Sequence, residues 1–239
     1  LPGVVIILAR LNDLSQIGNV QVIVNLIDKL QGSELYDTLQ SFPTLNHQIV
    51  YLMVTYLFAP FFLLIPIMAS SVVGANSFVG EKERKTLESL LLSPIDMKSL
   101  FIGKLLSAFI PAVTISLATF LLYGLVVNGI AYPLFETIIF PTWNWVILIM
   151  WVIPVVSLTV ILINVLISAK VKGYQEAYQL GGLVVLPVIA LIASQFTGLL
   201  FLSSLVSFVI GLVLLLVNVV LLQVIARRNN RITLSERQI

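Results

Sequence analysis

The chain has 239 residues, of which 59% are hydrophobic and 10% are charged, and its formal net charge at pH 7 is +2. A soluble globular domain needs more polar surface than this composition supplies, so the sequence indicates an integral membrane protein. The lack of cysteine in the sequence excludes disulfides and thiolate metal sites.

Residues 1–48 precede the long apolar stretches and predict a small outer domain. Apolar residues recur at helical spacing from Val20 to Leu30, and Ser33 is a predicted N-cap of a second short helix that ends before Pro43. We favour packing against the membrane face over ligand binding for these helices. Residues Val4–Leu8 fit either the last turns of a further upstream span or a strand of the outer domain, and His47 is expected to be a solvated boundary residue.

Four uncharged stretches are long enough to cross a bilayer, for which about 20 helical residues suffice. The last is of double length and is predicted to fold back near Thr197 to Ser204, which gives five spans within residues 49–226 and a tail at 227–239. The stretches are Ile49–Val79, Leu105–Val127, Trp145–Ala169 and Ala177–Ala226. The fold class expected is an all-α bundle. The linker Asn128–Asn144, rich in proline and aromatic residues, is expected to lie at the outer membrane interface or to dip partly into the membrane.

The basic residues predict the orientation of these spans. Eleven of the thirteen Lys and Arg residues lie in three segments, namely between the first two spans, between the third and fourth spans, and in the tail. Basic residues near span ends stay on the cytoplasmic side. We therefore expect a cytoplasmic C-terminus and an extracytoplasmic segment 1–48, which implies a sixth span upstream of Leu1 in the native protein.

Every predicted span except the last contains proline, which removes a backbone hydrogen bond and bends a helix. We favour a role in helix shape over a hinge. Three strongly polar side chains lie deep in the spans, and either hydrogen bonding between helices or the lining of a translocation path would explain them. They are Asn164, Gln195 and Asn218.

Residues 80–93 form a charged segment between the first two spans. Leu87, Leu90 and Leu91 make an apolar stripe at helical spacing, charged residues surround it, and Ser93-Pro94 ends the helix. Such a short amphipathic helix could lie on the lipid surface or dock into a groove of a partner, and the residues by themselves leave both possibilities open.

This segment resembles the signature of the permeases of type-2 ATP-binding-cassette (ABC) transporters, the exporter group that includes sodium and multidrug efflux permeases. The similar residues run from Glu81 through Glu83-Arg84, Thr86-Leu87-Glu88 and Leu90-Leu91 to Ser93-Pro94, followed by Gly103-Lys104. The resemblance implies a coupling helix that contacts a nucleotide-binding ATPase subunit, a second permease chain (identical or different), and a location in the prokaryotic cell membrane. It also implies coupling roles for Glu81, Glu83, Arg84, Thr86 and Glu88.

The sequence has no P-loop, because the nearest approach, Gly74 to Lys82, has Val79 where the second glycine is required. We therefore expect no ATP site in this chain, with ATP and Mg²⁺ bound by the ATPase partner. Because no His, Asp or Glu lies deep in the spans, we also expect no catalytic site or metal site. No cofactor and no nucleic-acid partner are expected for this chain. The leading hypothesis is the permease of an ATP-driven exporter. An ATP-independent secondary transporter or channel is the alternative, although it would usually place ionisable residues inside the membrane.

Overall fold

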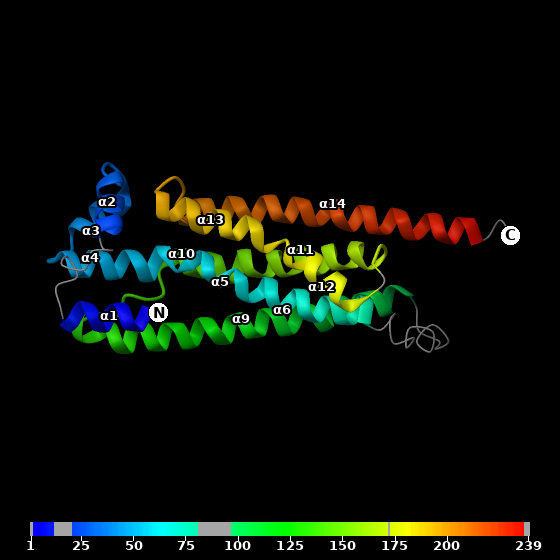
Figure 1. Cartoon of the computed structure of the whole chain (residues 1–239), viewed down its shortest axis with the longest axis horizontal. Coiled ribbons are helices and arrows are strands. Elements are labelled where there is room, and N and C mark those ends of the chain that lie inside the picture. Colours follow the sequence, from blue (N-terminus) through cyan, green and yellow to red (C-terminus); the bar gives the residue numbers. More distant parts are fainter. Residues whose placement is uncertain (1, 12–20, 81–96, 172, 237–239) are drawn as a thin grey trace. The chain divides into compact units, whose positions relative to one another are not determined.

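The computed structural model describes residues 2–11, 21–80, 97–171 and 173–236, and all the regular structure in these ranges is helical (Figure 1). Five helical segments are long and apolar enough to cross a membrane. We call them the first to fifth spans: Leu45–Gly80, Ser99–Phe135, Trp143–Ser168, Tyr174–Thr197 and Ser204–Arg227. The all-α class, the five spans and the turn between the last two are confirmed.

Three short helices precede the first span: α1 (Pro2–Leu11), α2 (Gln21–Lys29) and α3 (Glu34–Gln40). The two expected amphipathic helices are thus confirmed, and the Ser33 hydroxyl caps α3 by accepting a 3.2 Å hydrogen bond from the amide of Tyr36. The strand interpretation of Val4–Leu8 is wrong, because these residues lie in α1.

The first and third spans are not continuous α-helices. The first consists of α4 (Leu45–Leu52), the π-helical turn η2 (Met53–Leu57), α5 (Ala59–Phe62), α6 (Leu64–Ala75) and η3 (Asn76–Gly80). The third consists of α10 (Trp143–Ile147), the π-helical turn η4 (Leu148–Val152) and α11 (Ile153–Ser168). In both spans a widened turn comes just before a proline, Pro60 or Pro154, whose missing N–H cannot complete the preceding helical turn.

The second span belongs to α9 (Met97–Phe135), which continues through Pro111 and Pro133. The expectation that a linker begins at Asn128 is therefore wrong. Helix α1 lies along the C-terminal end of α9 (Figure 1), with Gly3 next to the side chain of Ile130. Val127 and Ala131, in this same part of α9, are fully buried, and such burial favours a packed helix over a linker at the membrane interface.

His47 is not a solvated boundary residue, which corrects the expectation from the sequence. The half-buried ring has Nε2 2.9 Å from the carbonyl oxygen of Leu134 and Nδ1 2.6 Å from the hydroxyl of Thr44. It also meets the ring of Phe135 edge to face, with 5.0 Å between the ring centroids. The extension of α9 to Phe135 supplies the contacts with Leu134 and Phe135, and the sequence pattern did not predict that extension.

The fourth span comprises α12 (Tyr174–Gly182) and α13 (Val185–Thr197), and the fifth lies within α14 (Ser204–Glu236). Gly198 makes the turn between them with a positive φ of 77°, which a residue without Cβ adopts at no steric cost. In the most apolar stretch of the first and third spans, 56% and 61% of the residues are buried, against 17% in each of the other three. The first and third spans are therefore the more enclosed ones.

The chain divides into two compact units. Unit 1 contains Leu1–Leu63, Leu117–Ile149 and Leu186–Ser207, and unit 2 contains Leu64–Ser116, Met150–Val185 and Phe208–Ile239. In unit 1 the helices α1 and α3 pack with α4, and in unit 2 α6 packs against α11 and α12. Each unit has its own group of buried polar side chains.

Candidate functional site

The π-helical turn η2 is the most connected feature of unit 1. The amide of Phe58 bonds to the carbonyl of Met53 at 3.0 Å, so the hydrogen bond skips one residue more than in an α-helix. Three successive carbonyls in this turn, those of Val54, Thr55 and Tyr56, accept hydrogen bonds from side chains of three other spans. The backbone carbonyls of η2 thus accept hydrogen bonds from the second, third and fourth spans.

Two aromatic side chains donate the first two of these three hydrogen bonds. The Tyr123 hydroxyl on α9 donates to the Val54 carbonyl at 2.9 Å, and the Trp145 indole N–H on α10 donates to the Thr55 carbonyl at 2.8 Å. The two rings are stacked, with 5.0 Å between their centroids, and Phe62 and Phe140 meet Trp145 edge to face. Buried Tyr and Trp usually find a partner for their polar atom, and here the backbone of the first span provides it.

Gln195 on α13 makes the third bond. It is fully buried, and with its amide nitrogen turned toward the first span it donates to the Tyr56 carbonyl at 3.1 Å. Its amide oxygen then accepts from the backbone N–H of Leu202 at 3.0 Å. Pro60, four residues after Tyr56, has no N–H to offer that carbonyl, so Gln195 occupies an acceptor that a regular helix would use itself. The side chain connects the first span to the turn after α13.

Asn164 lies in unit 2 between two glycines. Its amide nitrogen donates to the carbonyl of Val160 at 3.1 Å, whereas its Oδ1 has no hydrogen-bond partner among the described residues. A Cβ added at Gly181 of α12 would stand 2.8 Å from this oxygen, and one at Gly74 of α6 would stand 3.3 Å from the nitrogen. The two glycines therefore provide the space that holds a polar side chain between three helices.

Asn218 on α14 bonds to the third span. Its Nδ2 donates to the carbonyl of Val155 at 3.0 Å, and this carbonyl also accepts the Thr159 hydroxyl at 2.8 Å. Asn164, Gln195 and Asn218 have exposures of 0%, 0% and 2%, so none of them reaches the surface of the chain. The structure brings Asn164 and Asn218 into unit 2 and Gln195 into unit 1. Their role in a path stays a prediction.

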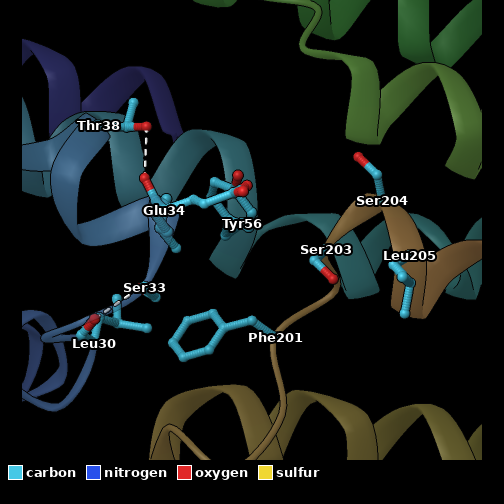
Figure 2. A pocket seen from close by; sticks show the side chains of 10 residues that line it. Leu30, Ser33, Glu34, Thr38, Tyr56, Phe201, Ser203, Ser204 and Leu205 are labelled. Atoms are coloured by element: carbon cyan, nitrogen blue, oxygen red, sulfur yellow. Dashed lines mark hydrogen bonds between the residues drawn. The ribbon is translucent and has the colours of Figure 1, made fainter.

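Unit 1 also contains a pocket of about 540 Å³, shown in Figure 2. One wall comes from the turn after α2 and from α3, one from Tyr56 in the first span, and one from the turn that leads into α14 and the start of that helix. The Glu34 side chain extends from α3 toward Tyr56, and the Phe201 ring points from the turn toward Leu30 and Ser33 (Figure 2). The lining residues are Leu30, Ser33, Glu34, Leu35, Thr38, Tyr56, Phe201, Ser203, Ser204 and Leu205.

The predicted coupling residues Glu81, Glu83, Arg84, Thr86 and Glu88 lie outside the described residues. The described first span ends just before them, at Gly80. In the part of the chain that the structure describes, no group of three or more His, Cys, Asp or Glu side chains is arranged to hold a metal ion.

The comparison with protein families shows to which family of membrane proteins the chain belongs. Residues 9–218 match the family described as ABC-2 family transporter protein, and this match covers most of the chain. The chain belongs to this family. The permease has no match among curated proteins or solved structures. Family membership and the five apolar helices make it a multi-pass membrane component of a transporter, of a kind that normally works with an ABC ATPase subunit and is not itself catalytic.

Sequence reasoning missed most of the permease residues that build these sites. Tyr123 and Trp145 could have been noticed, because a polar aromatic atom inside a span needs a hydrogen-bond partner. Pro60 also signals that the carbonyl four residues earlier lacks its usual donor. No pattern in the sequence links Glu34 with Tyr56 and Phe201, because the pocket forms only when the turn after α13 meets α3.

Proposed function

We propose that the permease is the transmembrane subunit of an ATP-driven exporter in a prokaryotic cell membrane. The observation that carries the proposal is the match of residues 9–218 to the ABC-2 transporter family. The sequence contains no P-loop, so the energy would come from a separate ATPase subunit that binds ATP and Mg²⁺. A second permease chain would complete the transporter.

In this proposal the segment 80–93 transmits the motion of the ATPase. Glu81, Glu83, Arg84, Thr86 and Glu88 would dock on the ATPase subunit, and ATP binding would favour one arrangement of the spans over another. Only such a difference in free energy between the two arrangements can drive alternating access. Asn164, Gln195 and Asn218 are the proposed polar positions along the path.

Purification of the tagged permease from its native membrane tests the proposal. We expect an ABC ATPase subunit and one or two kinds of permease chain in the eluate, and we expect the reconstituted complex to transport only with ATP and Mg²⁺. Transport by the permease alone, without any ATPase subunit, would contradict the proposal and support a secondary transporter.

A Glu83→Ala, Arg84→Ala double variant tests the coupling residues. We expect it to insert normally and to lose most of the transport and most of the stimulation of ATP hydrolysis. Lys170→Ala is the matched control, because it removes a charge from a different predicted cytoplasmic segment. Equal losses in both variants, or unchanged transport in the double variant, would count against docking at Glu83 and Arg84.

The structure offers little support for an ion-coupled alternative. Within the described spans the charged residues are Lys104, Glu176 and Arg227, and each stands within a few residues of a span end. Coupling to an ion gradient usually requires ionisable groups deeper in the membrane.

A further inference from the structure

The pocket of unit 1 has the size and the walls of a small-molecule site. Its volume of about 540 Å³ lies within the range of roughly 300–1,000 Å³ that is typical of ligand pockets. Leu30, Leu35 and Leu205 supply aliphatic surface, and Phe201 and Tyr56 supply aromatic rings. A ligand that fills this space needs an apolar body.

Two hydroxyls that line the pocket are already used inside the fold. The Ser33 hydroxyl donates to the Leu30 carbonyl at 2.7 Å and accepts from the Tyr36 amide at 3.2 Å. The Thr38 hydroxyl donates to the carbonyl of Glu34 at 2.9 Å (Figure 2). Neither hydroxyl has a proton left to donate to a ligand, so these two groups form part of the pocket wall and do not act as hydrogen-bond donors for a ligand.

The Glu34 carboxylate is the one charged group that lines the pocket, and no salt bridge to it is found among the described residues. The surrounding segment 21–42 contains three acidic residues and one basic residue. That basic residue, Lys29, donates from Nζ to the carbonyl of Thr197 at 3.2 Å and does not line the pocket. The local charge therefore disfavours anions.

We propose that this pocket binds a hydrophobic organic cation, meaning an ammonium group attached to an apolar body. The ammonium group lies by the Glu34 carboxylate, and the apolar body contacts Phe201, Leu205 and the ring of Tyr56. Aromatic rings add to the attraction because their faces are negative and favour a cation nearby. Neutral polar ligands lack the charge contact, and organic anions meet an unpaired carboxylate.

The pocket wall that contains Phe201 is the turn between α13 and α14, and contacts on both sides of this turn hold it in place. Gly198 packs against the side chains of Leu26 and Lys29, and the buried amide of Gln195 holds the backbone of Leu202 next to that of Tyr56. The pocket is thus tied to both α2 and the first span.

Calorimetric titration of the complete permease in nanodiscs of neutral phosphatidylcholine tests the proposal, with the heat from empty discs subtracted. The probes are octyltrimethylammonium and octyl sulfate, which share a chain length and differ in charge, each below its micelle-forming concentration. We expect saturable binding of the cation and none of the anion. Equal binding of both probes, or binding of neither, would overturn the proposal.

Variants on α3 then test whether the Glu34 carboxylate is the group that attracts the cation. Glu34→Gln is expected to weaken cation binding about threefold, because one partly solvated charge contact is lost. Asp37→Asn removes a charge from the same helix at a residue that does not line the pocket, and it should leave binding within about twofold of wild type. Glu34→Lys should abolish binding of the cation and create binding of octyl sulfate. Equal effects of Glu34→Gln and Asp37→Asn would show a general surface-charge effect and refute the site.

Phe201→Ala supplies a second measurement that does not involve charge. It should weaken the binding of octyltrimethylammonium in discs whose helical circular dichroism matches that of wild type. Unchanged binding would show that the cation does not enter the pocket. All these titrations are made without ATP or an ATPase subunit, so their outcome does not depend on whether the permease is an exporter.

Discussion

The Tyr123 hydroxyl and its bond to the Val54 carbonyl give a single-atom test of the contacts at η2. Tyr123→Phe removes the oxygen, keeps the ring in its stack on Trp145, and leaves the carbonyl with one donor fewer. Hydrogen bonds between membrane helices contribute about 0.6 kcal/mol on average and up to about 1.7. We expect the free energy of unfolding in bicelles, measured by denaturant titration, to fall by about 1 kcal/mol.

Tyr132→Phe is the matched control for that measurement. Tyr132 lies on the same helix, is 58% exposed and belongs to no ring stack among the described residues. Its loss of a hydroxyl should change the free energy of unfolding by less than about 0.5 kcal/mol. A decrease in the free energy of unfolding at position 132 as large as that at position 123 would show that the Tyr123–Val54 hydrogen bond does not contribute specifically to stability.

The two adjacent glycines at the end of α12 differ in what a side chain would meet. In Gly181→Ala the new Cβ would stand 2.8 Å from Asn164 Oδ1, whereas nothing lies within 4 Å of a Cβ at Gly182. Overpacking a tight contact costs about 1–3 kcal/mol, so we expect Gly181→Ala to lower the free energy of unfolding by that amount and Gly182→Ala to change it little.

A second substitution tests the cause of that loss. Asn164→Ala removes the atoms that the new Cβ would meet, so it should recover part of the stability lost in Gly181→Ala. Strictly additive losses in the double variant would mean that the clash lies elsewhere.

At the scale of the element, Pro60 and the π-helical turn η2 act together. Gln195→Leu leaves both the Tyr56 carbonyl and the Leu202 amide without this partner, which should cost about 1–3 kcal/mol. Pro60→Ala restores a backbone N–H that can bond to the Tyr56 carbonyl. We therefore expect Gln195→Leu to cost less in the Pro60→Ala background, with a coupling free energy of about 0.5–1 kcal/mol from unfolding titrations of the four proteins.

Pro66→Ala is the control for this cycle. Pro66 lies in α6, beyond the turn whose carbonyls bind side chains from other spans. Its effect should add to that of Gln195→Leu within about 0.5 kcal/mol. Coupling of equal size at both prolines would argue for a general loosening of the first span in place of competition for one carbonyl.

The membrane-spanning helices were largely predictable, because each span corresponds to one continuous run of apolar residues in the sequence. The turn between the fourth and fifth spans was predictable because the apolar stretch is too long for one span, and the Ser33 cap because serine is a preferred N-cap residue. The extension of α9 to Phe135 was not predictable, because the residues that contact this end of the helix, such as Gly3 and His47, lie far away in the sequence. The contacts of His47 could therefore not be predicted either. Asn164, Gln195 and Asn218 were chosen as candidate site residues because polar amides are rare in spans, and their role in a path stays a prediction. Their partners are mostly backbone carbonyls, which look alike in any sequence.

At the scale of the whole molecule, the spans differ in how much surface they leave uncovered. The second, fourth and fifth spans each bury only 17% of their most apolar stretch within this chain, although their mean hydropathies of 2.1, 2.0 and 3.0 are close to the 2.2 and 2.9 of the enclosed spans. Apolar surface of this kind is stable only against lipid or another apolar chain. A five-span chain also places the segments on either side of any one span on opposite faces of the membrane.

The lack of cysteine makes the orientation directly measurable, because the wild-type chain gives no labelling background. Thr137→Cys places a thiol at an exposed residue between the second and third spans, and Gly173→Cys places one between the third and fourth, where a Cβ has open space. The basic residues of the 170–172 segment predict that this side is cytoplasmic. We expect a membrane-impermeant maleimide to label position 137 in intact cells, and position 173 only after permeabilisation. Labelling of position 173 alone in intact cells would invert the proposed orientation, and labelling of both would mean that the third span does not cross the membrane.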